Sequence, residues 1–325
     1  MDICATDEKT GDKIFMADDP IHRYTLPQLE PWRDRINEPD LETYCRSFVP
    51  KYSFELQTLC VQIKQKSEEW LNIRSKLLTC SNFGIISRTN PYEKPENFLT
   101  KWIWNQRQAS NAAMEWGSHY ESFARDSYLS YINQPAIKQL WFPGVPHVQL
   151  PCNIASFFPM TNLEKIINES YQSGKTYQHN DIDIIELGIC IDDRHPWAGG
   201  SPDGIICQYD ALLGRLVVIG LLEIKCPFRK KFYEPIPKYY IDQVQGFMNM
   251  FHIPWCHFVT WIPPTSFQGN LKVDFIAQDA AYWNDTLFPC LERFYFGQCL
   301  PKQIQKAKQI LLSGTLCPIE AWEND

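Results

Sequence analysis

The chain lacks the cysteine spacing that marks a zinc site or a small disulfide-bonded domain. Its 12 cysteines include no C-x-x-C pair, and the two closest in sequence are Cys290 and Cys299. Structural zinc sites and disulfide frameworks both need cysteines at short, paired spacing. We therefore expect the cysteines to serve mostly as small apolar fillers, in a protein of a reducing intracellular compartment.

Membrane-associated segments are also lacking. The first residues, Met1-Asp2-Ile3-Cys4, lead into polar sequence and not into an apolar signal-peptide core. The longest apolar runs are far shorter than the roughly 20 residues that a membrane-spanning helix needs. The sequence shows no internal repeat and no low-complexity tract. The expectation is a soluble protein with no membrane partner.

What the sequence contains is typical of a globular protein. Hydrophobic residues make up 44% and charged residues 21% of the chain, which excludes a disordered composition. The formal net charge of −7 argues against a generic polyanion binder, but it leaves a local basic cleft open. A length of 325 residues suffices for one large domain or two ordinary ones.

Three parts of the chain are expected. Residues 1–65 are polar and contain prolines, which predicts an N-terminal extension or a small helical subdomain with a short helix near 40–48. The core domain is expected at residues 66–300, and residues 301–325 are expected to form a C-terminal tail.

Periodicity and turn residues predict the elements of the core domain. Helices are expected at 68–77, 82–87, 109–132, 162–171, 240–251 and 280–295. Strands are expected at 182–191, 205–209, 216–226, 256–261 and 273–276. The buried stripe of the long helix is expected to comprise Ala113, Gly117, Glu121, Ala124 and Tyr128. This order of elements predicts an α/β fold with a mixed central sheet flanked by helices.

The stretch LLEIKCP ends the most apolar of these strands, yet it carries two charges. Glu223 and Lys225 are two residues apart, so they share one face of the strand, and Ile224 points to the other face. Burying either charge without a partner would be unfavourable. The pair is therefore either a salt bridge at a strand end or a metal-binding carboxylate beside a lysine that acts on a water molecule.

A third polar residue precedes the neighbouring strand. Asp203 lies in the sequence GSPDG, which taken alone is an ordinary turn. If the two strands form an antiparallel hairpin, the start of one lies beside the end of the other. Asp203, Glu223 and Lys225 then converge, and two carboxylates with a lysine suit a divalent cation that activates water.

The pattern D…E-x-K resembles the PD-(D/E)-x-K nucleases, and its surroundings resemble one branch of them, the lambda-exonuclease or YqaJ-type viral recombinases, which are related to viral alkaline exonucleases. The resemblance spans roughly residues 67–297. It is carried by five motifs in family order, namely W-x3-R-x4-TCS from Trp70, WGSHYE with the following A-R from Trp116, SPDG with LEIKCPF, YYIDQVQGFM, and the closing helix at 279–295. Cys80 stands where the family usually has alanine. The resemblance implies a restriction-endonuclease-like core.

The resemblance also implies roles for the acidic residues. Asp203 and Glu223 would hold Mg²⁺ or Mn²⁺ together with the backbone carbonyl of Ile224, and Lys225 would orient or deprotonate the attacking water. Glu121 would contact a second metal ion, so that the site would hold two ions in all. Its alternative role is a surface pair with Arg125, one helical turn later.

Two glutamines and one further aspartate are weaker candidates. The resemblance places Gln243 or Gln245 in the site, and Gln245 is slightly favoured, although either could be an ordinary amide on the helix surface. Asp193 matches a position where the family sometimes has another acidic residue, but the sequence around it could equally form a plain turn.

Basic and hydroxyl residues are candidates for DNA binding. The resemblance implies that Arg74 and Ser81 receive the 5′-phosphate of the substrate strand. Arg74 could instead be a surface charge, and Ser81 could be the N-cap of the next helix. The run Arg229-Lys230-Lys231, with Lys238 beyond it, would track DNA or form a solvated face.

The resemblance implies a Mg²⁺-dependent exonuclease that degrades one strand of duplex DNA from its 5′ end, in recombination or replication of a viral type. Its partners would be double-stranded DNA with free ends and a single-strand annealing protein, in the host cytoplasm or nucleus. Two alternatives stay open, an endonuclease acting on DNA or RNA through the same metal site, and a nucleic-acid-binding module without catalysis. The oligomeric state is open as well.

Overall fold

The computed structural model describes most of the core domain and a few residues of the N-terminal region. The described residues are 4–6, 13–15, 54–103, 111–141, 160–171, 176–179, 181–264, 270–303 and 305. The short helix expected near 40–48 and most of the tail at 301–325 lie outside them. Near the N-terminus, β1 (Cys4–Thr6) and β2 (Lys13–Phe15) form an antiparallel pair. Within these ranges, no helix combines the length and the apolar character that crossing a membrane requires.

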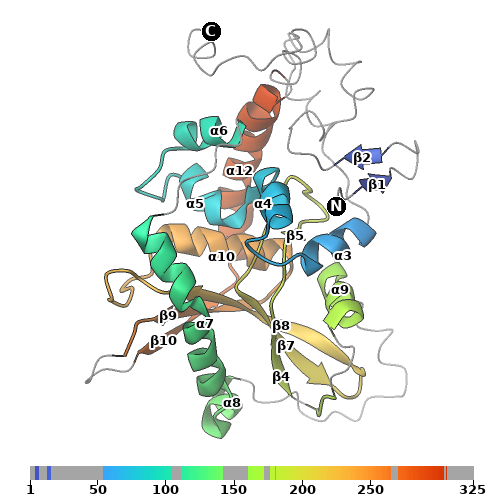
Figure 1. The fold of residues 1–325 in the computed structure, drawn as a ribbon, viewed down its shortest axis with the longest axis vertical. Helices are drawn as coiled ribbons and strands as arrows, with labels where there is room; N and C mark the ends of the chain where they lie inside the picture. Colours follow the sequence, from blue (N-terminus) through green and yellow to red (C-terminus); the bar gives the residue numbers. More distant parts are fainter. Residues whose placement is uncertain are drawn as a thin grey trace.

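A five-stranded mixed sheet forms the centre of the fold, in the order β10-β9-β8-β7-β4 (Figure 1). Its strands are β4 (Ile182–Ile185), β7 (Gly204–Asp210), β8 (Arg215–Lys225), β9 (Trp255–Trp261) and β10 (Leu271–Ala277). The pair β8 and β9 is parallel, and the other pairs are antiparallel. The expected α/β fold with a mixed central sheet flanked by helices is confirmed.

The register of the β7–β8 hairpin determines which residues meet at its open end. Gly204 pairs with Leu222, and a bulge interrupts the ladder between Ile206 and Cys207. One step beyond Gly204, the antiparallel register places Asp203 opposite Glu223. Paired residues of an antiparallel ladder point to the same face, so the hairpin presents both carboxylates on one side of the sheet.

The two faces of β8 belong to different hydrophobic clusters. Leu222 and Ile224 pack with Ala124 and Tyr128 of α7 (Ala112–Ile132), whereas Leu221 faces the cluster that contains α10 (Lys238–Met250). Only the second half of α7 is buried against the sheet, with α8 (Pro135–Trp141) following it (Figure 1). The expected buried stripe is therefore wrong in its first half, where Ala113 is exposed.

On the α10 side, helices approach each other closely at two glycines. A Cβ atom on Gly84 of α5 (Phe83–Ile86) would lie 2.4 Å from Tyr239 Cβ, and one on Gly246 would lie 2.5 Å from the Phe83 ring. This packing fixes α10 across β8. Also on this side are α6 (Pro95–Ile103), α11 (Ala280–Tyr282) and α12 (Phe288–Phe294), with π-helical segments at Trp283–Leu287 and Tyr295–Cys299.

A second, smaller sheet has the order β3-β6-β5, and the sequence patterns do not predict it. Its strands are β3 (Leu78–Thr79), β5 (Cys190–Ile191) and β6 (Ala198–Gly200). The single strand expected at 182–191 is in fact two strands, because the chain between them turns to bond another helix. Gly188 N donates to Val61 O at 2.6 Å and Ile189 N to Cys60 O at 2.9 Å.

That helix is α3 (Phe54–Gln62), the last part of the N-terminal region, and it packs against α9 (Asn162–Tyr171) and β5. The next helix, α4 (Glu68–Ser75), begins as expected at the N-cap Ser67, whose side chain accepts a hydrogen bond from Trp70 N at 3.2 Å. Helix α4 leads into β3 and a short 3₁₀ turn at Cys80–Asn82. Arg74 and Ser81 are thereby delivered to the end of the β7–β8 hairpin.

Of the eight cysteines between Cys60 and Cys299 that the structure describes, seven are buried and none forms a disulfide, in agreement with their expected role as apolar fillers. The buried ones are Cys60, Cys80, Cys190, Cys207, Cys226, Cys256 and Cys299.

Candidate active site

A cavity of about 200 Å³ opens at the end of the β7–β8 hairpin. Elements far apart in sequence contribute to it, namely the loop before α4, α4 itself, the 3₁₀ turn, α7, the hairpin and α10. Of the residues singled out in the sequence, its lining contains Arg74, Ser81, Glu121, Asp203, Glu223, Lys225 and Gln243. The structure therefore brings together residues from all of the quoted motifs except the closing helix.

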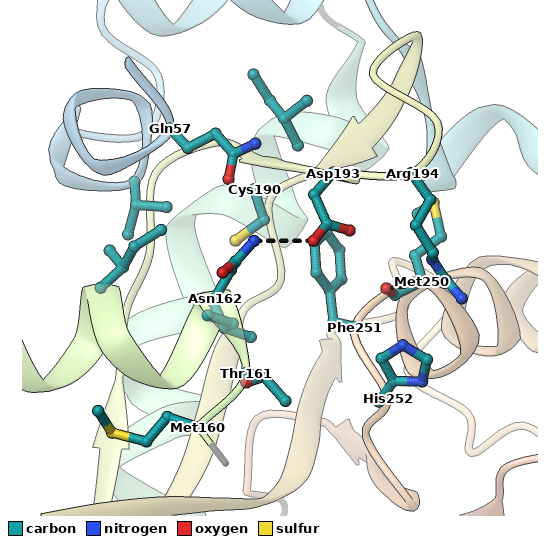
Figure 2. A pocket seen from close by; sticks show the side chains of 14 residues that line it. Gln57, Met160, Thr161, Asn162, Cys190, Asp193, Arg194, Met250, Phe251 and His252 are labelled. Atoms are coloured by element: carbon teal, nitrogen blue, oxygen red, sulfur yellow. Dashed lines mark hydrogen bonds between the residues drawn. The ribbon is translucent and has the colours of Figure 1, made fainter. Parts of the chain in front are cut away.

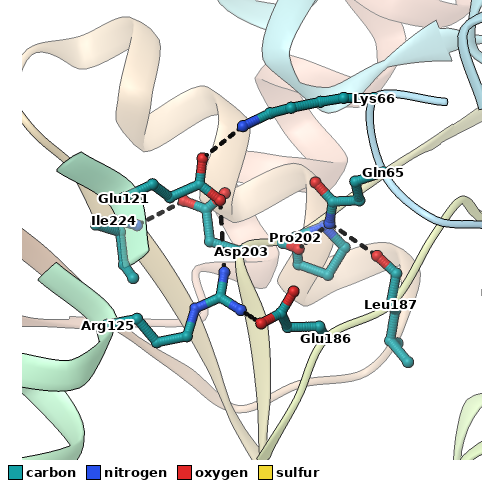
Figure 3. Close-up of polar contacts among 9 residues, drawn as sticks. All are labelled: Gln65, Lys66, Glu121, Arg125, Glu186, Leu187, Pro202, Asp203 and Ile224. Carbon is teal, nitrogen blue, oxygen red and sulfur yellow. Dashed lines mark hydrogen bonds and ion pairs between the residues drawn. The ribbon is translucent and has the colours of Figure 1, made fainter. Parts of the chain in front are cut away.

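Asp203 is held against β8 by a backbone contact. Ile224 N donates a hydrogen bond of 2.7 Å to Asp203 Oδ2 (Figure 3). This contact places the Asp203 carboxylate beside the backbone of Ile224. The hydrogen bond engages Oδ2 of the carboxylate.

Glu223 is the most buried charged group of the cavity, with 1% of its side chain exposed. Its Oε1 atom accepts hydrogen bonds from Lys225 Nζ and, at 2.7 Å, from Gln243 Nε2. Its Oε2 atom is buried and has no hydrogen-bond partner. An unpartnered buried carboxylate oxygen is unfavourable in isolation, so this atom indicates a ligand position.

The charges in the cavity influence one another. Burial, followed by the charge of Glu223, raises the pKa of Asp203 to about 8. Burial lowers the pKa of Lys225, but the charges of Glu223 and Asp203 outweigh it and raise that pKa above its ordinary value. A divalent cation would stabilise the ionised form of Asp203, which burial and the charge of Glu223 disfavour.

The donor set fits a divalent cation of the Mg²⁺ type. Among the described residues, no group of three or more His, Cys, Asp or Glu side chains is placed to hold a metal ion. Mg²⁺ keeps several waters and is often bound through one or two carboxylates plus substrate phosphates. Asp203 and Glu223, with the adjacent backbone of Ile224, satisfy that requirement.

Lys225 is placed beside both carboxylates and over an aromatic ring. Its side chain is 21% exposed, and Nζ lies 4.9 Å from the centre of the Tyr240 ring. The ring and Glu223 fix the position of the ammonium group. Both interpretations of the E-x-K pair remain compatible with this geometry, since a salt bridge is present and the ammonium also reaches the cavity.

Glu121 reaches the cavity from α7 but is less buried than its place on the expected stripe suggested, with 26% of its side chain exposed. Its Oε2 atom is 2.9 Å from Lys66 Nζ, and its Oε1 atom is 3.4 Å from Arg125 Nη2. Arg125 in turn pairs with Glu186 (Figure 3). The surface pair with Arg125 is thus present, and Glu121 also lines the cavity.

The two glutamines of α10 point in different directions. Gln243 contacts Glu223, whereas Gln245 Nε2 donates to Ala277 O at 2.8 Å and Gln245 Oε1 accepts from Asp279 N at 2.8 Å. Gln245 therefore ties α10 to the end of β10 and is not part of the cavity lining. The structure reverses the preference for Gln245 over Gln243.

Asp193 does not join the other acidic residues. It lines a second cavity of about 280 Å³ between α3, α9 and the end of α10, where Asn162 Nδ2 donates to Asp193 Oδ2 at 2.8 Å (Figure 2). The turn interpretation of this segment is supported by Arg194 N, which donates to Asp192 Oδ1 at 3.1 Å.

Arg74 and Ser81 contact each other at the edge of the candidate site. Arg74 Nη2 donates to Ser81 Oγ at 2.6 Å, and the guanidinium lies 4.8 Å from the centre of the Trp70 ring. Burial lowers the pKa of Arg74, which reflects the removal of its guanidinium from water. Ser81 lies inside the 3₁₀ turn, and the N-cap of the next helix, α5, is Asn82, so Ser81 is not that N-cap.

The basic run after β8 lies outside the cavity. Arg229, Lys230 and Lys231 are all exposed. Lys230 Nζ lies 5.0 Å from the centre of the Trp116 ring on α7. These three basic residues therefore form an exposed segment that follows β8, the strand that carries Glu223 and Lys225.

Six lining residues were not proposed as site residues from the sequence, and three of them carry an amide, an ammonium or a hydroxyl group: Gln65, Lys66 and Ser201. Ser201 Oγ accepts a hydrogen bond of 2.7 Å from Trp70 Nε1. Ser201 is the first residue of the SPDG turn, which is a signal that sequence reasoning could have used. Gln65 and Lys66 precede the N-cap of α4 and carry no such signal.

Comparison with known proteins identifies the family. A model of the YqaJ-like viral recombinase domain matches residues 69–140 and 161–250. The chain belongs to the YqaJ-like viral recombinase family, as its motifs indicated. A search of curated proteins finds no match.

Several solved structures match this chain, and three of them have titles that name an exonuclease. The alkaline exonuclease LHK-Exo from Laribacter hongkongensis is 20% identical, with 77% of this chain and 100% of that chain covered and a TM-score of 0.49. LHK-Exo in complex with dAMP gives 20% identity, the same coverage of 77% and 100%, and a TM-score of 0.48. A phage related exonuclease from Haemophilus somnus is 12% identical over 74% of this chain and 96% of that chain, with a TM-score of 0.25.

Proposed function

We propose that this protein is a metal-dependent nuclease that hydrolyses phosphodiester bonds of DNA. The observation that carries the proposal is the pair of carboxylates at the end of the β7–β8 hairpin. Asp203 and Glu223 line one cavity with Lys225, and the buried Oε2 atom of Glu223 has no partner. Such a set suits a hard divalent cation and a phosphate group.

Each residue of the pair and its neighbours would have a distinct role. Asp203 and Glu223, with the Ile224 carbonyl, would hold Mg²⁺ or Mn²⁺, which when bound activates water and offsets charge on the phosphate. Lys225 would orient the attacking water or accept its proton, and its charge would stabilise the transition state. Gln243 would keep Glu223 in place through its hydrogen bond to Oε1.

The substrate is proposed to be duplex DNA with free ends, degraded from the 5′ end. Arg74 and Ser81 meet at the cavity edge, where an arginine and a hydroxyl suit a terminal phosphate. The exposed run Arg229-Lys230-Lys231 would contact the backbone of the duplex. Such an activity would serve recombination or replication of a viral type inside the host cell, with a single-strand annealing protein as partner.

The test is nucleotide release from linear, 5′-phosphorylated duplex DNA. We expect release with Mg²⁺, none with EDTA, and none from a Lys225→Ala variant whose circular dichroism shows a folded protein. Lys165→Ala is the matched control, because Lys165 is exposed on α9 and is not part of the cavity lining. Robust release in EDTA would refute the metal-dependent assignment.

Two further substrates separate the finer parts of the proposal. A duplex with a 5′-hydroxyl end should be degraded more slowly than the phosphorylated one if Arg74 and Ser81 bind the terminal phosphate, and equal rates would remove that assignment. Cleavage of closed circular DNA would favour an endonuclease, whereas resistance of circles supports the exonuclease.

A further inference from the structure

The candidate cavity contains a lysine that belongs to none of the motifs. Lys66 is among the lining residues, and its Nζ atom lies 2.9 Å from Glu121 Oε2 (Figure 3). The side chain is 55% exposed, so the ammonium pairs with the carboxylate while it stays in contact with solvent. This group adds a positive charge to the cavity that Asp203 and Glu223 also line.

The backbone around Lys66 is held in a particular conformation. Lys66 has a φ of 68°, in the left-handed region that non-glycine residues seldom adopt. Gln65 anchors the segment, because its Nε2 atom donates to Leu187 O at 2.8 Å and to Pro202 O at 3.0 Å. Pro202 directly precedes Asp203, so the same contact ties Lys66 to the loop that carries the candidate ligand. Strained residues of this kind persist where their surroundings over-determine them.

Glu121 already has a cation at each of its carboxylate oxygens. Lys66 lies at Oε2 and Arg125 at Oε1. In the part of the chain that the structure describes, Glu121 does not combine with Asp203 and Glu223 into one metal-binding group of three. A divalent ion beside Glu121 would therefore have to displace the ammonium of Lys66.

We propose that the ammonium of Lys66 takes the place of a second divalent ion beside Glu121, so that the cavity binds a single divalent cation at Asp203 and Glu223. This inference rests on the proposed function, because it concerns the same cavity. Lys66 supplies the positive charge that would otherwise require a second ion, and it offsets the charge of Glu121 toward an approaching phosphate.

The stoichiometry of Mn²⁺ binding to the full-length, metal-free protein tests this directly, with isothermal titration calorimetry as the readout. The expected value for the wild type is one ion per chain. In Lys66→Gln the stoichiometry should rise to two, because the second position beside Glu121 becomes free. Lys66→Gly should give the same rise, and glycine suits the left-handed backbone, so this variant guards against misfolding.

Two controls identify the second position. Lys64→Gln removes an equal charge from an exposed residue outside the cavity lining and should leave one ion bound. In the double variant Lys66→Gln/Glu121→Gln, the number of Mn²⁺ ions bound per chain should return from two to one, because the second position has lost its carboxylate.

The possible failures are distinguishable. Two ions bound by the wild type, or one ion bound by both Lys66 variants, would overturn the inference and leave the metal-dependent nuclease intact. No Mn²⁺ binding by any form would overturn the inference together with the proposed metal dependence.

Discussion

Replacing Lys225 with alanine should destabilise the metal-free protein, because the buried carboxylate of Glu223 would lose its cation. Glu223 is 1% exposed and Lys225 21% exposed, so their ion pair is largely shielded from water. Removing one partner of a buried pair costs about 3–5 kcal/mol. Gln243 still donates to the same oxygen, so we place the loss of unfolding free energy at the lower end, about 3 kcal/mol.

A second substitution separates the cost of the unpaired charge from other effects. Glu223→Gln removes the charge with little change in shape. In the Lys225→Ala background it should restore most of the lost unfolding free energy, because no buried charge is then left without a partner. Nuclease activity should stay absent in the double variant despite its recovered stability.

Urea denaturation in EDTA measures these differences. Lys165→Ala serves again as the control and should change the unfolding free energy by less than about 0.5 kcal/mol, since surface substitutions are usually this mild. A loss below about 1 kcal/mol for Lys225→Ala, or a double variant less stable than Lys225→Ala, would refute the argument that Lys225 neutralises a buried Glu223.

The other predictions concern pH and packing. The pKa of Asp203 is raised to about 8 from an ordinary 3.8, first by burial and then by Glu223. The folded chain therefore binds this proton more tightly than the unfolded chain, and metal-free stability should fall as pH rises from 5 to 8, by up to about 1.4 kcal/mol per pH unit. In Asp203→Asn, the unfolding free energy measured by urea denaturation should no longer fall in this way between pH 5 and pH 8. The same dependence on pH in the wild type and in Asp203→Asn would contradict the assignment to Asp203. Gly84→Ala should cost about 2 kcal/mol, because its Cβ would lie 2.4 Å from Tyr239 Cβ and 2.7 Å from Tyr239 Cα. Gly117→Ala on α7 meets nothing within 4 Å and should not destabilise the protein; equal urea midpoints for the two alanine variants would argue against the close packing of α5 and α10.

The hairpin at the centre of the candidate site could be predicted from the sequence because its determinants are local. Strand alternation places Glu223 and Lys225 on one face, and the SPDG turn places Asp203 at the start of the neighbouring strand. No distant part of the chain is needed to deduce either relationship. The family motifs then identified the helices that bring Glu121 and Arg74 to the same cavity.

Other features depend on contacts that no local pattern contains. Gln243 and Gln245 face different sides of α10, and the side that meets β8 is set by the packing of Gly246 against Phe83. Lys66 reaches Glu121 across 55 residues, through a segment anchored at Leu187 and Pro202. The strands of the small sheet are two or three residues long, too short for a periodic pattern.

The carbonyl groups at the end of α3 have a practical consequence for anyone who shortens this protein. A version that starts at residue 66 would remove Cys60 O and Val61 O and leave the amides of Gly188 and Ile189, in the middle of the sheet region, without acceptors. It would also delete Gln65, the anchor of the loop that bears Asp203. A cut upstream of Phe54 avoids both losses, and it is the safer place to begin a minimal folded unit.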